Sequence, residues 1–224
     1  MTFWEKLVQP QVFVTMATRY GGTESVTRSP RVEDKIANGQ CLFVRRGSYM
    51  EMGGHGLVRS HVADDMMMAQ RFFTAGRTFA GMLGIDQLST RMYASFRELV
   101  DGWGKNVFAA GGDSVPLGKV GRFFFPVLLP VGPLSGFAPL LVLLASLFVS
   151  LPAGLVLWAG VSQILLLIWW MYLYRVIDES PLWAFLSPLG AAATFYIFVR
   201  AVLRGRRVSW KGRDYDTRTI LNAD

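Results

Sequence analysis

Residues 123–174 read FFFPVLLPVGPLSGFAPLLVLLASLFVSLPAGLVLWAGVSQILLLIWWMYLY, a run of 52 positions without one charged side chain. A second uncharged run, residues 182–199, follows after only seven residues. The hydrocarbon core of a bilayer is about 30 Å thick and needs about 20 apolar residues for each helical span. The sequence therefore predicts a membrane protein with three spans, at about 123–148, 152–174 and 182–203.

The spans divide the chain into three predicted parts: residues 1–120 form one small domain, 121–204 the transmembrane region and 205–224 a basic tail. The first span contains four prolines, so we expect it to be broken, re-entrant or interfacial. Three complete crossings would place the tail and residues 1–120 on opposite faces, although both carry positive charge. Either the first segment does not cross, or the tail lies outside.

The net charge of +7 is concentrated after the last apolar run, in Arg200, Arg204, Arg206, Arg207, Lys211 and Arg213. Such a cluster beside a span is typical of the cytoplasmic face and attracts anionic lipid headgroups. No zinc-ligand spacing or aromatic-basic motif accompanies it, so we expect no nucleic-acid partner. The expected location is the cell inner membrane, with residues 1–120 in the cytoplasm. Cys41 is the only cysteine, which excludes an intrachain disulfide.

Five elements are expected in residues 1–120 besides loops. An amphipathic helix over residues 3–20 should be interrupted at Pro10, because proline lacks the N–H that a helix needs. The apolar run Cys41–Val44 predicts a buried strand, and Thr78–Leu83 a weaker one.

Two further helices are predicted there. Asp64-Asp65 should open a helix that ends near Ala75, with Gly76 in the stop position. The apolar spacing of residues 91–108 predicts another helix.

The most informative polar residues lie in Gly53-Gly54-His55 and in Asp64-Asp65. Free backbone N–H groups at a helix start stabilise carboxylates as anions, and such a carboxylate can accept a proton from a hydroxyl nucleophile. Ordinary helix capping is the alternative interpretation. His55, His61 and the two aspartates are residue types that bind several divalent metal ions. Their spacing matches no established local motif, so no metal ligand is assigned.

Several motifs together resemble the membrane-attached family 2 glycosyltransferases that act on carotenoid, hopanoid or ceramide-type lipids. In that family a Gly-Gly-His or Gly-Gly-Phe turn precedes an acidic pair that opens an Asp-x-x-Leu-Ala-x-Arg helix, as Asp65–Arg71 does here. The other similar segments, in the family's order, are Ala37–Gln40, Phe43–Arg46, Tyr49–Glu51, Thr90–Tyr93, Gly102–Asn106 and Val208–Tyr215.

The resemblance implies a partial GT-A-type α/β glycosyltransferase domain followed by an α-helical transmembrane region. The complete enzyme would transfer a sugar from a nucleotide-sugar to the hydroxyl of a membrane lipid, with inversion. Asp65 matches the catalytic base that deprotonates the acceptor. Asp64 stands where the family usually has glutamate, so its carboxylate reaches one methylene less far.

Six further positions match the family's substrate-binding segments: Gly54, His55, Arg91, Trp103, Lys105 and Asn106. Lys105 could offset the charge of the leaving diphosphate. Packing in the core explains Trp103 as well as a site role does. A structural ion pair is an equally strong interpretation of Arg91.

One feature of the family is missing from this sequence. Family members begin with a nucleotide-binding half whose Asp-x-Asp motif holds a divalent cation, Mg²⁺ or Mn²⁺, on the donor diphosphate. No residue of this chain was identified as a ligand for that ion. Activity of the chain alone is therefore left open.

A partner chain that supplies the donor half is the main alternative. The chain would then be half of a split enzyme, or a non-catalytic membrane partner or remnant. A transporter is disfavoured, because the apolar runs carry almost no polar groups besides Gln163 and a few hydroxyls.

Overall fold

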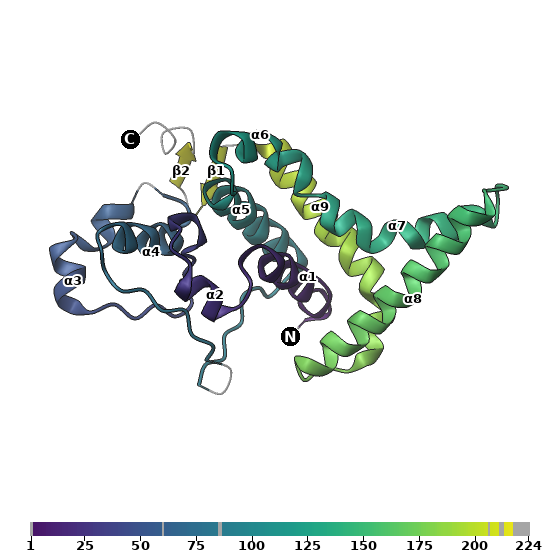
Figure 1. Ribbon diagram of the computed structural model, residues 1–224, viewed down its shortest axis with the longest axis horizontal. Helices are drawn as coiled ribbons and strands as arrows, with labels where there is room; N and C mark the ends of the chain where they lie inside the picture. The colour runs from purple at the N-terminus through teal and green to yellow at the C-terminus, as the bar shows by residue number, and fades with distance from the viewer. Residues whose placement is uncertain (1, 60, 85–86, 206, 211–212, 217–224) are drawn as a thin grey trace.

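The computed structural model describes residues 2–59, 61–84, 87–205, 207–210 and 213–216 (Figure 1). The polar part contains α1 (Phe3–Tyr20), α2 (Thr23–Arg28), η1 (Val32–Asp34), α3 (Arg46–Glu51), η2 (Gly54–Val58), α4 (Asp64–Thr74) and α5 (Phe96–Ser114). The apolar part contains α6 (Gly118–Leu128), α7 (Val131–Ser146), α8 (Ala153–Val176), η3 (Pro181–Leu186) and α9 (Ser187–Arg204). A hairpin of β1 (Arg207–Trp210) and β2 (Arg213–Asp216) follows.

The expected α/β domain is wrong. No strand forms in the described part of residues 1–120, and the two strands that are described pair only with each other. The predicted strand Cys41–Val44 forms no regular secondary structure and has no neighbouring strand, and 91% of Phe43 is exposed. Thr78–Leu83 is likewise unpaired. Apolar runs become strands only when another strand accepts their backbone hydrogen bonds, and this part of the chain offers none.

The predicted break of the first helix at Pro10 is also wrong, because α1 continues from Phe3 to Tyr20. Pro10 has no N–H to donate to the carbonyl of Lys6. The hydroxyl of Tyr174, in α8, donates to that carbonyl instead, at 3.0 Å. Thr2 and Glu5 form a capping box that fixes the start of the helix.

The main core lies where α1, α5 and α9 meet. It contains Val8 and Val12 of α1, Leu99, Val100 and Trp103 of α5, Ala193, Ile197 and Phe198 of α9, and Tyr93. The helix predicted from residue 91 begins only at Phe96, where the hydroxyl of Ser95 accepts from the N–H of Glu98. The core therefore joins the polar part of the chain to the last apolar helix.

Three helical segments among the described residues are long and apolar enough to cross a membrane: Gly118–Ser146, Ala153–Val176 and Pro181–Arg204. This fits the prediction of a membrane protein. The first is interrupted at Leu129 and Pro130, between α6 and α7, as its prolines predicted. Figure 1 shows the far ends of α7 and α8 projecting away from the other helices.

Candidate functional site

A surface pocket of about 530 Å³ brings together motif segments that are far apart in the sequence. Its lining comes from the loop around Gly39, from α3 and η2, and from the start of α4. The lining residues are Gly39, Leu42, Val44, Arg46, Tyr49, His55, Asp64, Asp65 and Met68. Three of the predicted site residues, Asp65, Asp64 and His55, therefore share one pocket.

Asp64 and Asp65 occupy the first turn of α4, as predicted. The carboxylate of Asp65 accepts from the N–H of Gly39 at 2.6 Å and from its neighbour Met66 N–H at 2.8 Å. Each oxygen thus has one backbone donor, which fixes the orientation of the group. The carboxylate of Asp64 is exposed and accepts from the N–H of Asp65 at 3.0 Å.

A backbone turn holds His55 beside this pair. Gly53 and Gly54 have φ angles of 80° and 57°, and a Cβ on Gly54 would lie 2.9 Å from the ring of Tyr49. The Tyr49 hydroxyl accepts from the N–H of His55 at 3.1 Å and lies 2.5 Å from its Nδ1. If Tyr49 donates to Nδ1, the proton of a neutral imidazole is on Nε2. Gly54 thus shapes the turn and is not itself a lining residue of the pocket.

Two lining residues were not among the predicted site residues. Arg46, at the start of α3, is an exposed cation on the pocket wall, and it forms no ion pair with the described residues. Tyr49 orients His55. Both lie in segments that carried the family resemblance, so their positions within those motifs were the available signal.

The remaining predicted site residues do not line the pocket. Trp103 is 5% exposed in the main core, where its ring meets Phe13 and Tyr93 edge to face. Lys105 and Asn106 are partly exposed on α5. Arg91 lies 3.8 Å from the buried carboxylate of Glu5. The position of Trp103 thus agrees with the packing interpretation, and that of Arg91 with the ion-pair interpretation.

Glu5 illustrates how the polar part supports buried charge. Its side chain is 2% exposed, and burial alone raises the pKa of a carboxyl group. Hydrogen bonds from the backbone and hydroxyl of Thr2 and from the N–H of Tyr93, with the nearby charge of Arg91, outweigh burial and lower the pKa of Glu5 below its ordinary value. Glu5 is therefore a structural anion, remote from the aspartate pair.

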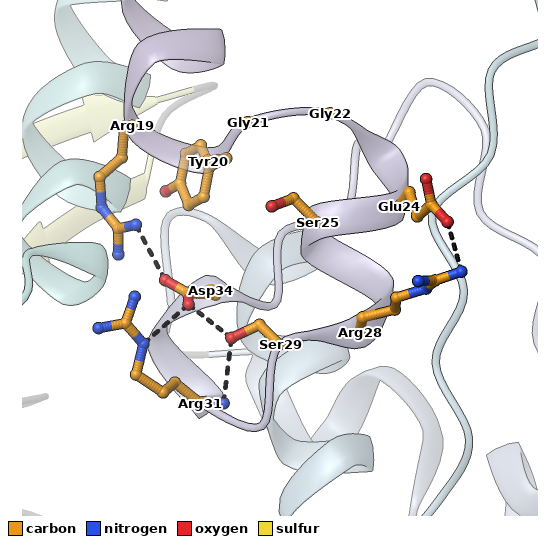
Figure 2. Close-up of a pocket in the computed structure, with 10 residues that line it drawn as sticks. All are labelled: Arg19, Tyr20, Gly21, Gly22, Glu24, Ser25, Arg28, Ser29, Arg31 and Asp34. Carbon is orange, nitrogen blue, oxygen red and sulfur yellow. Dashed lines mark hydrogen bonds and ion pairs between the residues drawn. The ribbon is translucent and has the colours of Figure 1, made fainter.

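A larger pocket, of about 760 Å³, lies between the end of α1, α2 and η1 (Figure 2). Its three arginines are all paired with carboxylates. Arg19 and Arg31 each lie 2.9 Å from Asp34, and Arg28 bonds Glu24. Each arginine of this pocket thus has a carboxylate partner inside it. We therefore interpret these ion pairs as a network that stabilises the fold.

Asp34 and Lys35 hold that network together. Burial raises the pKa of Asp34, but hydrogen bonds from Ser29, Arg19 and Arg31 outweigh it, so its pKa is lowered. Lys35 is fully buried, and its Nζ donates to the carbonyls of Val26 and Thr27 at 2.8 and 3.0 Å. Burial lowers the pKa of Lys35, against the opposing charge of Asp34. The pair ties α1 and α2 to the neighbouring elements.

Among the described residues, no three His, Cys, Asp or Glu side chains gather as a metal-binding group. The divalent cation expected of a complete enzyme therefore has no such cluster of ligands in this part of the chain. No protein-family model, curated protein or solved structure matches the chain.

Proposed function

We propose that this chain is the acceptor-side and membrane part of a membrane-bound family 2 glycosyltransferase. Within the complete enzyme, a sugar moves from a nucleotide-sugar to the hydroxyl of a membrane lipid. One observation carries the proposal: the pocket gathers the Asn-Gly-Gln loop, the Gly-Gly-His turn and the acidic pair, which the family resemblance selects independently of any structure. The hydrogen bond from Gly39 to Asp65 joins two of these motifs across 26 residues.

The proposed step uses Asp65 as the general base. Its carboxylate takes the proton of the acceptor hydroxyl while that oxygen attacks the anomeric carbon. The bond from that carbon to the donor phosphate oxygen breaks, and the nucleotide diphosphate leaves with the electron pair. Because the acceptor attacks from the side opposite to the leaving group, the configuration inverts. Gly39 and Met66 hold the base in place. Arg46 supplies positive charge on the same pocket wall, the role that the sequence suggested for Lys105.

The proposal is tested in cells of the source organism, where any missing part of the enzyme is present. Lipid extracts of a strain that lacks the gene are compared by mass spectrometry with those of strains rescued by variants. We expect the deletion to remove a glycolipid, the wild-type chain to restore it, and Asp65→Asn to fail. Asparagine keeps one acceptor oxygen for one of the two backbone N–H groups and is similar in size, so we expect this variant to reach the membrane at the wild-type level, as measured by immunoblot.

Two control variants accompany the test. Glu24→Gln removes an exposed carboxylate of the other pocket and should rescue fully. Asp64→Glu restores the residue type usual in the family and should also rescue. Unchanged glycolipids in the deletion strain, or full rescue by Asp65→Asn, would refute the proposed function.

A split enzyme or non-catalytic partner is the second candidate, and one observation favours it. The segment around Phe43 exposes apolar side chains, and the N–H groups of Leu42, Phe43 and Val44 donate no hydrogen bond within the described structure. Met82 and Leu83 are also 87% and 72% exposed. Backbone N–H groups without a partner can pair with a strand of another polypeptide.

This candidate predicts a complex larger than the 25.0 kDa chain in mild detergent extracts of the source membranes. Phe43→Asp should reduce the mass to that of the chain alone. Met50→Asp, which changes an apolar residue that is 66% exposed on a helix, should not. Light scattering after size exclusion measures both. A wild-type chain that is already alone would refute this candidate.

A further inference from the structure

The three apolar segments differ in how much of their surface the protein covers. In the most apolar stretch of Gly118–Ser146, and in that of α8, 11% of the residues are buried inside the protein. In the most apolar stretch of Pro181–Arg204, which contains α9, the buried share is 50%. A helix surrounded by lipid has little need of protein cover, whereas α9 has a covered face along its length. The polar part of the chain covers one side of α9 through α1 and α5. The base of the α7–α8 hairpin adds to this cover through α7, where the rings of Phe137 and Phe195 lie 5.5 Å apart.

Polar contacts hold α9 at both ends. Near its start, the amide of Gln11 donates to the carbonyl of Ser187 at 3.1 Å. Near its end, Arg200 lies 3.0 Å from Asp101 of α5. These positions are about 20 Å apart along the axis at about 1.5 Å per residue. If α9 crossed the bilayer, α1 and α5 would have to enter the hydrocarbon with it.

Such an entry would be costly, because α1 and α5 carry charges of their own. Glu5 and Lys6 lie on α1, and Arg97, Glu98 and Asp101 lie on α5. Charged side chains at the bilayer centre are costly and are rare in membrane-spanning helices. The contacts with α1 and α5 thus place α9 at the membrane surface.

The α7–α8 hairpin has the opposite character. It contains no charge before Arg175, and its tip exposes Leu147, Phe148 and Val149. With 24 residues, α8 is about 36 Å long, enough to reach across a hydrocarbon core.

The base of the hairpin is aromatic and then charged. It contains Trp169, Trp170, Tyr172 and Tyr174, followed by Arg175, Asp178 and Glu179. Aromatic residues of this kind collect at membrane–water interfaces. An ion pair of 2.7 Å between Lys6 and Glu179 fixes this base to α1. The hairpin therefore enters the membrane from the face on which the polar part lies.

We propose that only the α7–α8 hairpin enters the bilayer and that α9 lies along the membrane surface. The partner is the lipid bilayer, entered from one face. Residues 2–116 and the basic C-terminal tail then lie on that same face, and both positively charged regions meet the same headgroups. This inference is independent of the proposed sugar transfer.

Labelling of single cysteines in sealed membrane vesicles of known orientation tests the proposal. The probe is a membrane-impermeant maleimide, applied before and after detergent. Cys41 of the wild-type chain reports the polar part. In a Cys41→Ser background, Ile177→Cys reports the base of the hairpin, Asn222→Cys the tail, and Ser150→Cys the tip.

We expect the first three sites to react from the same face. A tail cysteine that reacts only from the face opposite to residue 177 would mean that α9 crosses, and would overturn the proposal. A tip that reacts only after detergent, or only from the far face, supports insertion of the hairpin. A tip that reacts from the face of Cys41 would overturn it. Protease access to an epitope added to the C-terminus of the otherwise unchanged chain gives the same answer without cysteine substitutions.

Discussion

The contact between α1 and α9 depends on a glycine, and Gly190→Ala tests it. A Cβ on Gly190 would lie 2.6 Å from the carbonyl oxygen of Leu7 and 3.4 Å from the amide of Gln11. The first contact is with the backbone of a helix, which cannot rotate away as a side chain can. To restore an ordinary contact of 3.4 Å, α1 must move from α9 by about 0.8 Å.

Two effects of opposite sign decide the result. Alanine is a better helix former than glycine by about 1 kcal/mol. Overpacking of a close contact costs about 1–3 kcal/mol, and a clash with backbone belongs at the upper end. We therefore expect a net loss of about 2 kcal/mol. For a chain of this size that lowers the melting temperature by about 4–8 °C.

The measurement is thermal unfolding of the purified protein in detergent, followed by tryptophan fluorescence. Gly104→Ala is the matched control, because Gly104 lies inside α5 and a Cβ there meets nothing within 4 Å. The control should melt at or above the wild-type temperature. If Gly190→Ala also melts no lower than wild type, the close packing of α1 on α9 is refuted.

Two further substitutions test the network and the core. Asp34→Asn should cost about 2–3 kcal/mol, because the charge that orients Arg19 and Arg31 is lost. Since the folded-state pKa of Asp34 is lowered from 3.8, its contribution is present above pH 3.8 and lost as pH falls through the folded value. Wild-type melting temperatures should thus decline in that acid range more steeply than those of the variant, and equal slopes would contradict the assignment. Trp103→Phe should cost about 1 kcal/mol and Trp103→Ala about 3–5 kcal/mol, because the buried Nε1 finds no acceptor among the described residues and the ring only fills the core. Lost glycolipid rescue by a stable Trp103→Phe variant would instead indicate a substrate contact.

Local signals in the sequence were sufficient for α4 and its acidic pair. Asp64 and Asp65 favour a helix start, and Gly76 adopts a φ of 73° just after the helix ends. The turn at Gly53-Gly54 follows from glycine chemistry in the same way. These residues need no distant partner to adopt their conformations, which is why a sequence pattern predicts them.

Predictions that depended on distant partners failed. Pro10 does not break α1, because Tyr174 satisfies the carbonyl that proline leaves free, and 164 positions separate the two residues. Cys41–Val44 has the composition of a buried strand, but a strand also needs a neighbour. Trp103 and Asp65 belong to one family resemblance, yet the fold places one in the core and the other in a surface pocket.

The Asp34–Lys35 pair explains how the pocket is positioned relative to the membrane helices. Through Asp34, η1 holds Arg19 at the end of α1 (Figure 2). The same guanidinium donates to the carbonyl of Ser114 at the end of α5. Lys35, which follows η1 directly, contacts Phe73 of α4, and its Nζ lies 4.3 Å from the centroid of that ring. The helix that carries the acidic pair is thus connected to the two helices that cover α9. Loss of Asp34 should therefore disturb the position of α4 and its pocket as well as the stability of the fold.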